Sequence, residues 1–234
     1  MNTQTLAQPR KLSKKIFVPP LENGDRLTRE EFHRRYEAMP ENVKAELIEG
    51  VVYMASPVRV KKHGKPHARI MGFLSYYQFT TKNIDLLDNV TYIANEKYEP
   101  QPDAVLRIEE NYGGKSWINI NDYLEGAPEL VVEIASSSAS YDLHDKLEMY
   151  EQKGVQEYIV WRVLDNQIDW FGLEKEKYKK FVRNKQGIIE SKVSPGLRLN
   201  VKAMLKDDLQ KVLSDLQKGL ESKKYKDFVG QLSK

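Results

Sequence analysis

The chain has 234 residues, of which 40% are apolar and 30% are charged, with a net charge of +3 and no cysteine. This composition indicates a globular protein with a sizeable core, and it excludes disulfides, zinc–thiolate sites and cysteine nucleophiles. No apolar run approaches the roughly 20 residues that a membrane-spanning helix needs, and the basic N-terminus lacks the apolar core of a signal peptide. We therefore expect a cytoplasmic protein that does not contact membranes.

The first segment of the chain predicts an arm followed by a capped helix. Residues 1–24 are polar and basic and contain turn-forming dipeptides, so we expect a flexible N-terminal arm. Thr28 precedes Glu31 by three positions, which is the spacing of a capping box. A helix should therefore begin after Thr28 and end at Pro40.

The middle of the chain predicts several strands and one helix. Ile70, Phe73, Leu74 and Tyr77 recur at helical spacing and indicate a helix with one apolar face. In chain order, we expect two short strands within residues 45–54, this helix over 66–80, strands over 84–94 and 103–108, and an irregular segment over 109–127.

A compact strand, helix and strand follow. Residues 129–134 are an apolar run with one internal acid, residues 141–153 form a helix that Gly154 ends, and residues 156–163 are a second apolar strand. The short links between them predict a βαβ unit with parallel strands and a right-handed crossover. A hairpin over 166–183, a strand near Gly196, and helices over 201–217 and 222–232 complete the chain.

The βαβ unit within this order of elements predicts an α/β fold. We expect the arm of residues 1–24 to precede a domain over residues 25–200. The amphipathic helices of residues 201–234 would then form a C-terminal helical appendage.

Two carboxylates stand where packing alone would not place them. Glu133 lies inside the apolar run 129–134, on the same strand face as Val131, where an unpaired charge costs several kcal/mol. Asp103 opens a strand directly after Pro102, so it should project from the end of a neighbouring strand. Adjacent carboxylates repel unless a cation lies between them, and Mg²⁺ takes one or two carboxylates together with several waters.

A lysine on the next helix completes the pattern. Lys146 borders the apolar stripe of that helix, and its side chain could reach back to Glu133 as a counter-ion that orients or deprotonates a metal-bound water. Each residue also has a structural interpretation: Asp103 could end a strand, Glu133 could pair with an arginine, and Lys146 could extend to solvent. The catalytic hypothesis depends on all three meeting in one βαβ region.

Two basic segments could contact phosphates. Residues 59–69 hold five Lys or Arg, two His and no acid, and residues 175–185 hold six Lys or Arg and one acid. Such patches can form an electrostatic footprint for nucleic acid. A solvated loop and a solvated hairpin are the simpler explanations for each segment taken alone.

At these residues the chain resembles a known family. The strings AELIEGVVY, QPDAVL, APELVVEIASSS and DLHDKLEMYEQKGVQEYIVW are similar to the Uma family of putative restriction endonucleases, within the PD-(D/E)XK nuclease superfamily, over roughly residues 27–200. In the standard signature the lysine lies two residues after the acid, where this chain has Ala135. In the Uma family the lysine lies on the following helix, which matches Lys146.

The resemblance implies a restriction-endonuclease-like fold, in which helices flank a mixed β-sheet, and a set of site residues. It implies Asp103 and Glu133 as ligands of Mg²⁺ or Mn²⁺, and Lys146 beside the attacking water. Glu46 matches a further acidic position, which completes the metal shell or acts on a second ion, or is simply an exposed acid of a hairpin. His67 also falls at a family-like position, with either a phosphate-contacting or a polar structural role.

We therefore predict a metal-dependent endonuclease that hydrolyses phosphodiester bonds in DNA and acts as a homodimer. The residues expected to contact phosphates are Arg59, Lys61, Lys62, Lys65 and His67. The main alternative is a catalytically inactive nuclease-fold protein that binds nucleic acid or a protein partner. A two-carboxylate glycosidase would not need Lys146, and an assembly protein could dimerise through residues 201–217.

Overall fold

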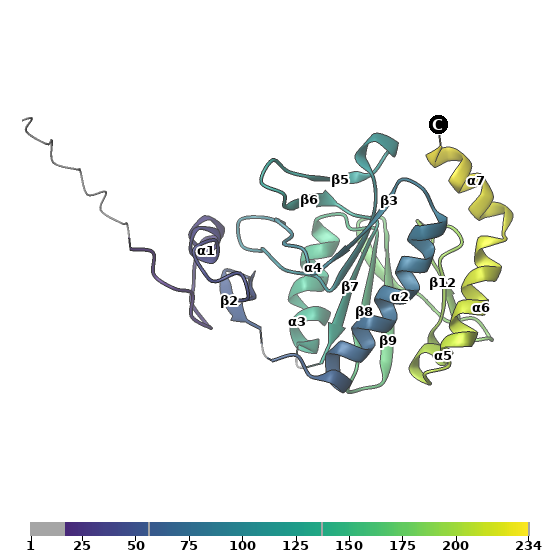
Figure 1. Ribbon diagram of the computed structural model, residues 1–234, viewed down its shortest axis with the longest axis horizontal. Helices are drawn as coiled ribbons and strands as arrows, with labels where there is room; N and C mark the ends of the chain where they lie inside the picture. Colours follow the sequence, from purple (N-terminus) through teal and green to yellow (C-terminus); the bar gives the residue numbers. More distant parts are fainter. Residues whose placement is uncertain (1–16, 56, 137, 234) are drawn as a thin grey trace, which may run out of the picture.

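The computed structural model describes residues 17–55, 57–136 and 138–233 (Figure 1). Most of the predicted N-terminal arm, residues 1–16, lies outside the described residues. The end of that arm packs against the protein, because Leu21 is buried and the Gly24 amide donates to the Val52 carbonyl at 2.8 Å. In the part of the chain that the structure describes, no helix is both long enough and apolar enough to cross a bilayer.

A six-stranded mixed sheet forms the centre of the molecule, as the resemblance to the family implied. Its strand order is β10-β9-β8-β7-β4-β3, and β7 and β8 are its parallel pair. The other neighbouring strands are antiparallel. The strands are β3 (Ile84–Asp88), β4 (Ala104–Ile108), β7 (Leu130–Ala135), β8 (Glu157–Arg162), β9 (Gln167–Glu174) and β10 (Lys177–Lys180).

Strand β7 lies inside the sheet because its sequence is apolar on both faces. All six of its residues are buried. Val132 and Ile134 belong to the apolar cluster on one face of the sheet, whereas Val131 and Ala135 belong to the cluster on the other face. Glu133 therefore shares a face with Val131, as the alternation of side chains along a strand requires.

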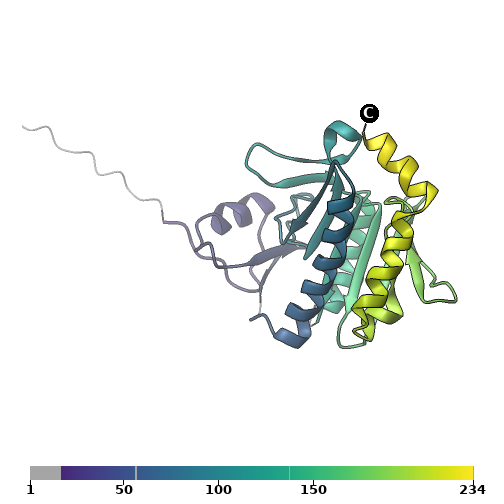
Figure 2. The same cartoon turned by 45° about the vertical axis from the view of Figure 1, so that its right-hand side comes forward.

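Helices cover both faces of the sheet (Figures 1 and 2). One face carries α2 (Lys65–Thr80), and α6 (Leu209–Leu220) lies beside it, preceded by α5 (Val201–Leu205) and followed by α7 (Lys223–Leu232). The other face carries the short helices α3 (Ala139–Leu143) and α4 (Asp145–Gln152).

The three C-terminal helices share the main apolar core. Met204, Leu216 and Tyr225 are buried in the same cluster as Trp170 of the sheet. Complete burial of a large apolar side chain contributes about 1.5–3 kcal/mol, so these contacts hold the helices firmly to the sheet. The hairpin of β11 (Ile188–Glu190) and β12 (Arg198–Asn200) leads directly into α5.

A small N-terminal unit packs against the edge of this core (Figure 1). It consists of α1 (Arg29–Tyr36), β1 (Ala45–Ile48) and β2 (Val51–Met54). The Thr28 hydroxyl accepts from the Glu31 amide at 3.3 Å, which confirms the predicted cap. Glu49 and Gly50 both have positive φ, the backbone of the tight turns that join hairpin strands.

The segment predicted to be irregular, residues 109–127, contains a hairpin. After a short 3₁₀ turn, β5 (Lys115–Ile118) pairs with β6 (Leu124–Ala127). Arg107 of β4 donates to the Ser116 carbonyl at 2.9 Å and so attaches this hairpin to the sheet. Strands of four residues are too short for an alternating pattern to stand out from the sequence.

Two predicted helices are each divided in the structure. The helix expected over residues 141–153 breaks at His144, where the Tyr158 hydroxyl donates to the Asp142 carbonyl at 3.0 Å. The helix expected over residues 201–217 breaks at Asp207, which has positive φ, and Asp208 then caps α6. Conversely, the basic loop before α2 contains one π-helical turn, η1 (Val60–Gly64).

A buried acid stabilises the connection between the sheet and the C-terminal hairpin. Glu157, at the start of β8, accepts from the Trp170 indole at 2.9 Å and from the Lys192 amide at 2.6 Å. Burial raises the pKa of Glu157 to about 7, although these hydrogen bonds lower it in part. The native state therefore holds a proton on Glu157 over a pH range in which the unfolded state has lost it.

This proton predicts a pH-dependent effect of Glu157→Gln. Between pH 4.5 and about 7 the native state binds more protons at this position than the unfolded state does, so the wild-type free energy of unfolding falls as pH rises. The free energy of unfolding of the wild type should therefore fall relative to that of Glu157→Gln across this range, by at most about 1.4 kcal/mol per pH unit. Urea denaturation at several pH values measures it, with the exposed Glu176→Gln as control. A difference that does not change with pH would contradict the assignment.

Candidate active site

An ion-pair cluster lies on the α4 face of the sheet, centred on Lys146. The ammonium nitrogen of Lys146 lies 2.9 Å from Glu46 Oε1 and 3.0 Å from Glu133 Oε1. The carboxylate of Asp142 lies slightly farther away, with Oδ1 at 3.6 Å from the same nitrogen. Lys146 is only 3% exposed, so the alternative interpretation, in which this side chain extends to solvent, is wrong.

Glu133 reaches this cluster from the middle of the sheet. Its Oε1 also accepts from the Tyr150 hydroxyl at 3.1 Å, one helical turn beyond Lys146 on α4. Burial raises the pKa of Glu133 well above its ordinary value, and the charge of Lys146 opposes that shift. The partner of this buried carboxylate is thus Lys146 rather than an arginine.

Asp103 joins the cluster from the residue before β4. Its Oδ2 accepts from the Ile134 amide at 2.6 Å, immediately after Glu133 in β7. Its Oδ1 lies 3.1 Å from Nε2 of His63, and this contact with Asp103 raises the pKa of His63. The hydrogen bond to the β7 backbone holds Asp103 beside the strand that carries Glu133.

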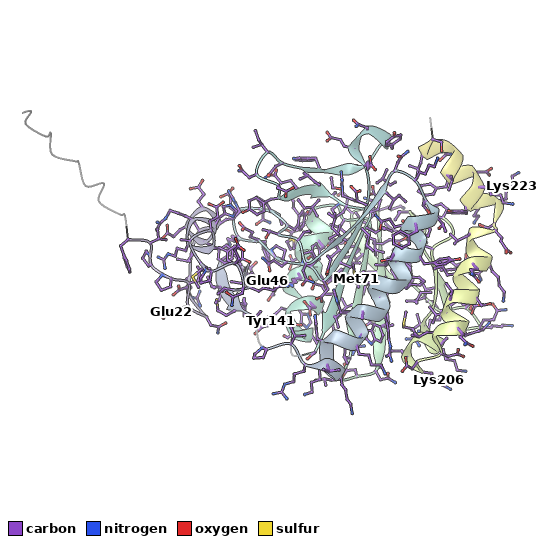
Figure 3. All side chains as sticks on the ribbon, in the orientation of Figure 1. Glu22, Glu46, Met71, Tyr141, Lys206 and Lys223 are labelled. Atoms are coloured by element: carbon purple, nitrogen blue, oxygen red, sulfur yellow. The ribbon has the colours of Figure 1, made fainter. Side chains whose placement is uncertain are left out.

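Glu46 enters from the separate hairpin of β1 and β2. Its Oε1 accepts from Lys146 and also from the backbone amide of Gln101, at 2.7 Å. The second hydrogen bond attaches β1 to the segment before Asp103. Its side chain is 25% exposed, the most open of the carboxylates that Lys146 contacts. Figure 3 shows Glu46 on the same side of the molecule as Tyr141 of α3, which packs on Tyr53 of β2.

Asp142 is a member of the cluster that sequence reasoning missed. It is 1% exposed, and neither of its carboxylate oxygens forms a hydrogen bond with the described residues. Burial raises its pKa to about 6, and the charge of Lys146 and the nearby Ser138 hydroxyl lower it in part. The spacing of four residues between Asp142 and Lys146 was a visible signal, as was the same spacing between Lys146 and Tyr150.

The cluster therefore places three carboxylates around one ammonium group, with Asp103 beside them on the segment before β4. Although burial lowers it, the attraction of Glu133, Glu46 and Asp142 raises the pKa of Lys146 well above its ordinary value. Glu133 is in turn affected by the charges of Asp142, Glu46 and Asp103. One lysine and the adjacent His63 leave an excess of negative charge, which favours the arrival of a cation.

The chemistry of these donors fits a hard divalent cation. Carboxylate oxygens are the ligands that Mg²⁺ and Mn²⁺ prefer, and Mg²⁺ commonly uses only one or two of them with several waters. Asp103 and Glu133 on neighbouring strands could supply such a pair, with Glu46 at the open side. Across residues 17–233 as described, no three His, Asp or Glu side chains already converge on one ion position.

The residues predicted to contact phosphates fall into two groups. Arg59, Lys61 and Lys62 are exposed in and beside η1, which immediately precedes His63. Lys65 instead pairs with Asp207 at 2.9 Å, on the side of α2 that faces the C-terminal helices. The first group lies at the edge of the cluster, whereas Lys65 already has an acidic partner.

His67 lies beside the cluster, on the first turn of α2. Its Nε2 lies 3.1 Å from the Asp103 carbonyl and 3.0 Å from the Asp88 carboxylate. Its ring stacks on that of His63 with centroids 5.5 Å apart. Through these contacts His67 connects the first turn of α2 to Asp103 and Asp88, and its phosphate-contacting role stays a prediction.

Comparison with known proteins identifies the family. The model of the Uma2 family, described as "Putative restriction endonuclease", matches residues 29–202. The chain belongs to the Uma2 family. The matched region contains every carboxylate of the cluster and Lys146. A comparison with curated proteins found no match.

A solved structure shows the same fold. The crystal structure of a putative nuclease belonging to DUF820 from Anabaena variabilis ATCC 29413 is similar to this Uma2 protein with a TM-score of 0.55. The two chains share 12% sequence identity over 74% of this chain and 96% of the other. At this identity the similarity supports the predicted restriction-endonuclease-like fold.

The cluster predicts a large stability cost for Lys146→Met in this Uma2 protein. The substitution leaves Glu133 and Asp142 buried without a counter-ion, and loss of one partner from a buried ion pair typically costs about 3–5 kcal/mol. The loss should be smaller at pH 5 than at pH 8, because protonation neutralises the stranded carboxylates. Urea denaturation measures both effects, with Lys153→Met at the end of α4 as the control. Equal stability of the two variants would contradict the central role of Lys146.

Proposed function

We propose that this protein is an endonuclease that hydrolyses phosphodiester bonds in DNA with the help of Mg²⁺ or Mn²⁺. The observation that supports this most strongly is the contact of Lys146 with Glu133 and Glu46, beside Asp103. Of the four residues predicted to act in catalysis, Glu133 and Lys146 lie in one βαβ unit, Asp103 directly precedes the neighbouring strand β4, and Glu46 lies on β1. Membership of the Uma2 family agrees with a nuclease.

Each side chain has a defined part in this proposal. Asp103 and Glu133 would hold the cation, and Glu46 would complete its shell from the open side. When bound, the cation supplies a more acidic water and polarises the phosphate oxygen. The Lys146 ammonium group would orient the attacking water and stabilise the negative charge that develops on the phosphate. Tyr150 orients the Glu133 carboxylate through its hydroxyl.

Phosphate contacts would hold the substrate over this cluster. Arg59, Lys61 and Lys62 are exposed, lie next to His63, and form no ion pair with the described residues. Lys and Arg contacts to phosphates position a nucleic acid without reading its sequence. The exposed residues of η1 are therefore the proposed backbone-binding segment.

A second candidate is a nuclease-fold protein that binds nucleic acid without cutting it. The observation that favours it is that no three ligand side chains already converge on one ion position among the described residues. The cleavage experiment below separates it from the first candidate.

The predicted homodimer and cytoplasmic location stay predictions. Sedimentation of the purified protein tests whether it forms a homodimer.

The proposed function predicts cleavage that depends on Glu133. Purified protein with Mn²⁺ or Mg²⁺ should nick or cut plasmid DNA, and EDTA should stop the reaction. Glu133→Gln should lower the rate at least about a hundredfold, since it removes a charged metal ligand but keeps the shape of the side chain. Glu129→Gln is the matched control, because Glu129 is also buried, beside the start of β7, and accepts from the Ile108 amide.

The same gel assay distinguishes the candidates. Cutting by Glu133→Gln at the wild-type rate would show that the reaction comes from another site or a contaminant. Binding of DNA by the wild type without cutting in either metal would favour the inactive alternative.

The phosphate-binding role of η1 predicts a change in salt dependence. In the Glu133→Gln background, replacing Arg59, Lys61 and Lys62 with Ala should weaken DNA binding and lower the slope of log affinity against log salt by up to about three units. The matched control replaces Lys177, Lys179 and Lys180 of β10, which removes the same charge from residues that already pair with acids. Fluorescence anisotropy with labelled DNA measures the affinity of both variants at several salt concentrations. A larger effect of the β10 variant would indicate that the DNA binds to the basic segment of residues 175–185 instead.

A further inference from the structure

Asp142 has a position that neither packing nor the proposed catalytic roles explain. Both of its carboxylate oxygens are buried without a hydrogen bond to the described residues, yet Oδ1 lies only 3.6 Å from the Lys146 nitrogen. Its main chain is held separately, because the Tyr158 hydroxyl donates to its carbonyl at 3.0 Å. The carboxylate is therefore fixed beside the lysine but just outside hydrogen-bond distance.

Such an arrangement is unfavourable by itself. A buried polar group without a partner costs about 1–3 kcal/mol, and more when it is charged. Buried side-chain oxygens in native proteins nearly always have a partner, so an orphaned pair at a functional site calls for an explanation. The charged donor beside it is Lys146, whose closer contacts are Glu46 and Glu133.

The closer partners of Lys146 are the same carboxylates that would hold a cation. A divalent ion on Glu133 and Glu46 would compete with the ammonium for their oxygens and would repel it. An ammonium group has three donors and needs acceptors when it is buried. Asp142 is the remaining carboxylate within reach, and a movement of less than about 1 Å would bring Lys146 into hydrogen-bond distance of it.

We propose that Asp142 is a positioning residue that takes over the ion pair of Lys146 when a divalent cation occupies Glu46 and Glu133. Asp142 then keeps Lys146 charged and in place beside the attacking water, so that cation and lysine can share one site. This inference rests on the proposed function, because it requires that the cation binds there. It assigns the buried carboxylate to the cation-bound state rather than to the stability of the cation-free protein.

The inference predicts how Asp142→Asn changes the binding of Mn²⁺ alone, without DNA. Calorimetric titration at pH 7.5 should show an affinity about tenfold weaker than that of the wild type, because the lysine loses its charged alternative partner. The unfolding midpoint of the cation-free protein should stay the same or rise, since relief of the cost of burying this carboxylate without a hydrogen bond offsets the loss of its 3.6 Å ion pair with Lys146. Asp145→Asn makes the same chemical change three residues later, outside the partners of Lys146, and should change the Mn²⁺ affinity less than twofold.

A double-mutant cycle tests whether Asp142 acts through the lysine. In the Lys146→Met background, Asp142→Asn should change the Mn²⁺ affinity less than threefold, because the group that Asp142 positions is gone. An equal effect in both backgrounds would show that Asp142 acts only as a nearby charge, and this would overturn the inference. Rescue of the Asp142→Asn affinity by Lys146→Met would support it.

The remaining outcomes separate the inference from the proposed function. Wild-type affinity in Asp142→Asn, or a lower unfolding midpoint with unchanged affinity, would make Asp142 a structural residue and leave the nuclease proposal intact. A wild-type protein that binds no Mn²⁺ at all would contradict the proposed metal-dependent function, and the inference would fall with it.

Discussion

The burial of a charged lysine among carboxylates is the interaction on which the rest of the site depends. A charged carboxylate in the middle of β7 is costly without a counter-ion, and α4 supplies Lys146 directly after that strand. The same ammonium contacts Glu46, and so fastens the N-terminal hairpin to the central sheet. One buried positive charge thus joins the N-terminal hairpin, strand β7 and helix α3, and its removal should disturb both the fold and the chemistry.

The surrounding fold holds these charges in register. Strand β7 is buried on both faces, so packing fixes the position of its backbone. The Asp103 carboxylate accepts a hydrogen bond from the Ile134 amide of this strand. Tyr150 orients Glu133, and Tyr158 holds the Asp142 carbonyl at the break between α3 and α4. An active site needs this precision, since small displacements of catalytic groups lower reaction rates strongly.

Local patterns of sequence predicted the parts of the structure that depend on near neighbours. The apolar run around Glu133, the helix after it and the parallel strand beyond it formed the expected βαβ unit. Because that unit brings its strand end and helix together, the meeting of Glu133 with Lys146 could be anticipated. The approach of Glu46, from a hairpin about a hundred positions away in the chain, came only from resemblance to the family.

Other features depend on contacts that periodicity does not contain. Arg107 attaches the hairpin of β5 and β6 to the sheet. The helix after β7 divides where the Tyr158 hydroxyl donates to the Asp142 carbonyl. Asp142 was missed because an acid on a helix is usually exposed, and its burial follows from packing between α3 and the sheet. His63 was counted as one more basic residue, although it contacts Asp103.

A crystal of the protein grown with Mn²⁺ and measured at an anomalous wavelength tests the account most directly. The account predicts a single strong anomalous peak between the carboxylates of Asp103 and Glu133, with the Lys146 nitrogen displaced toward Asp142. A crystal with no peak at this position, in which Lys146 keeps its contacts with Glu46 and Glu133, would contradict it.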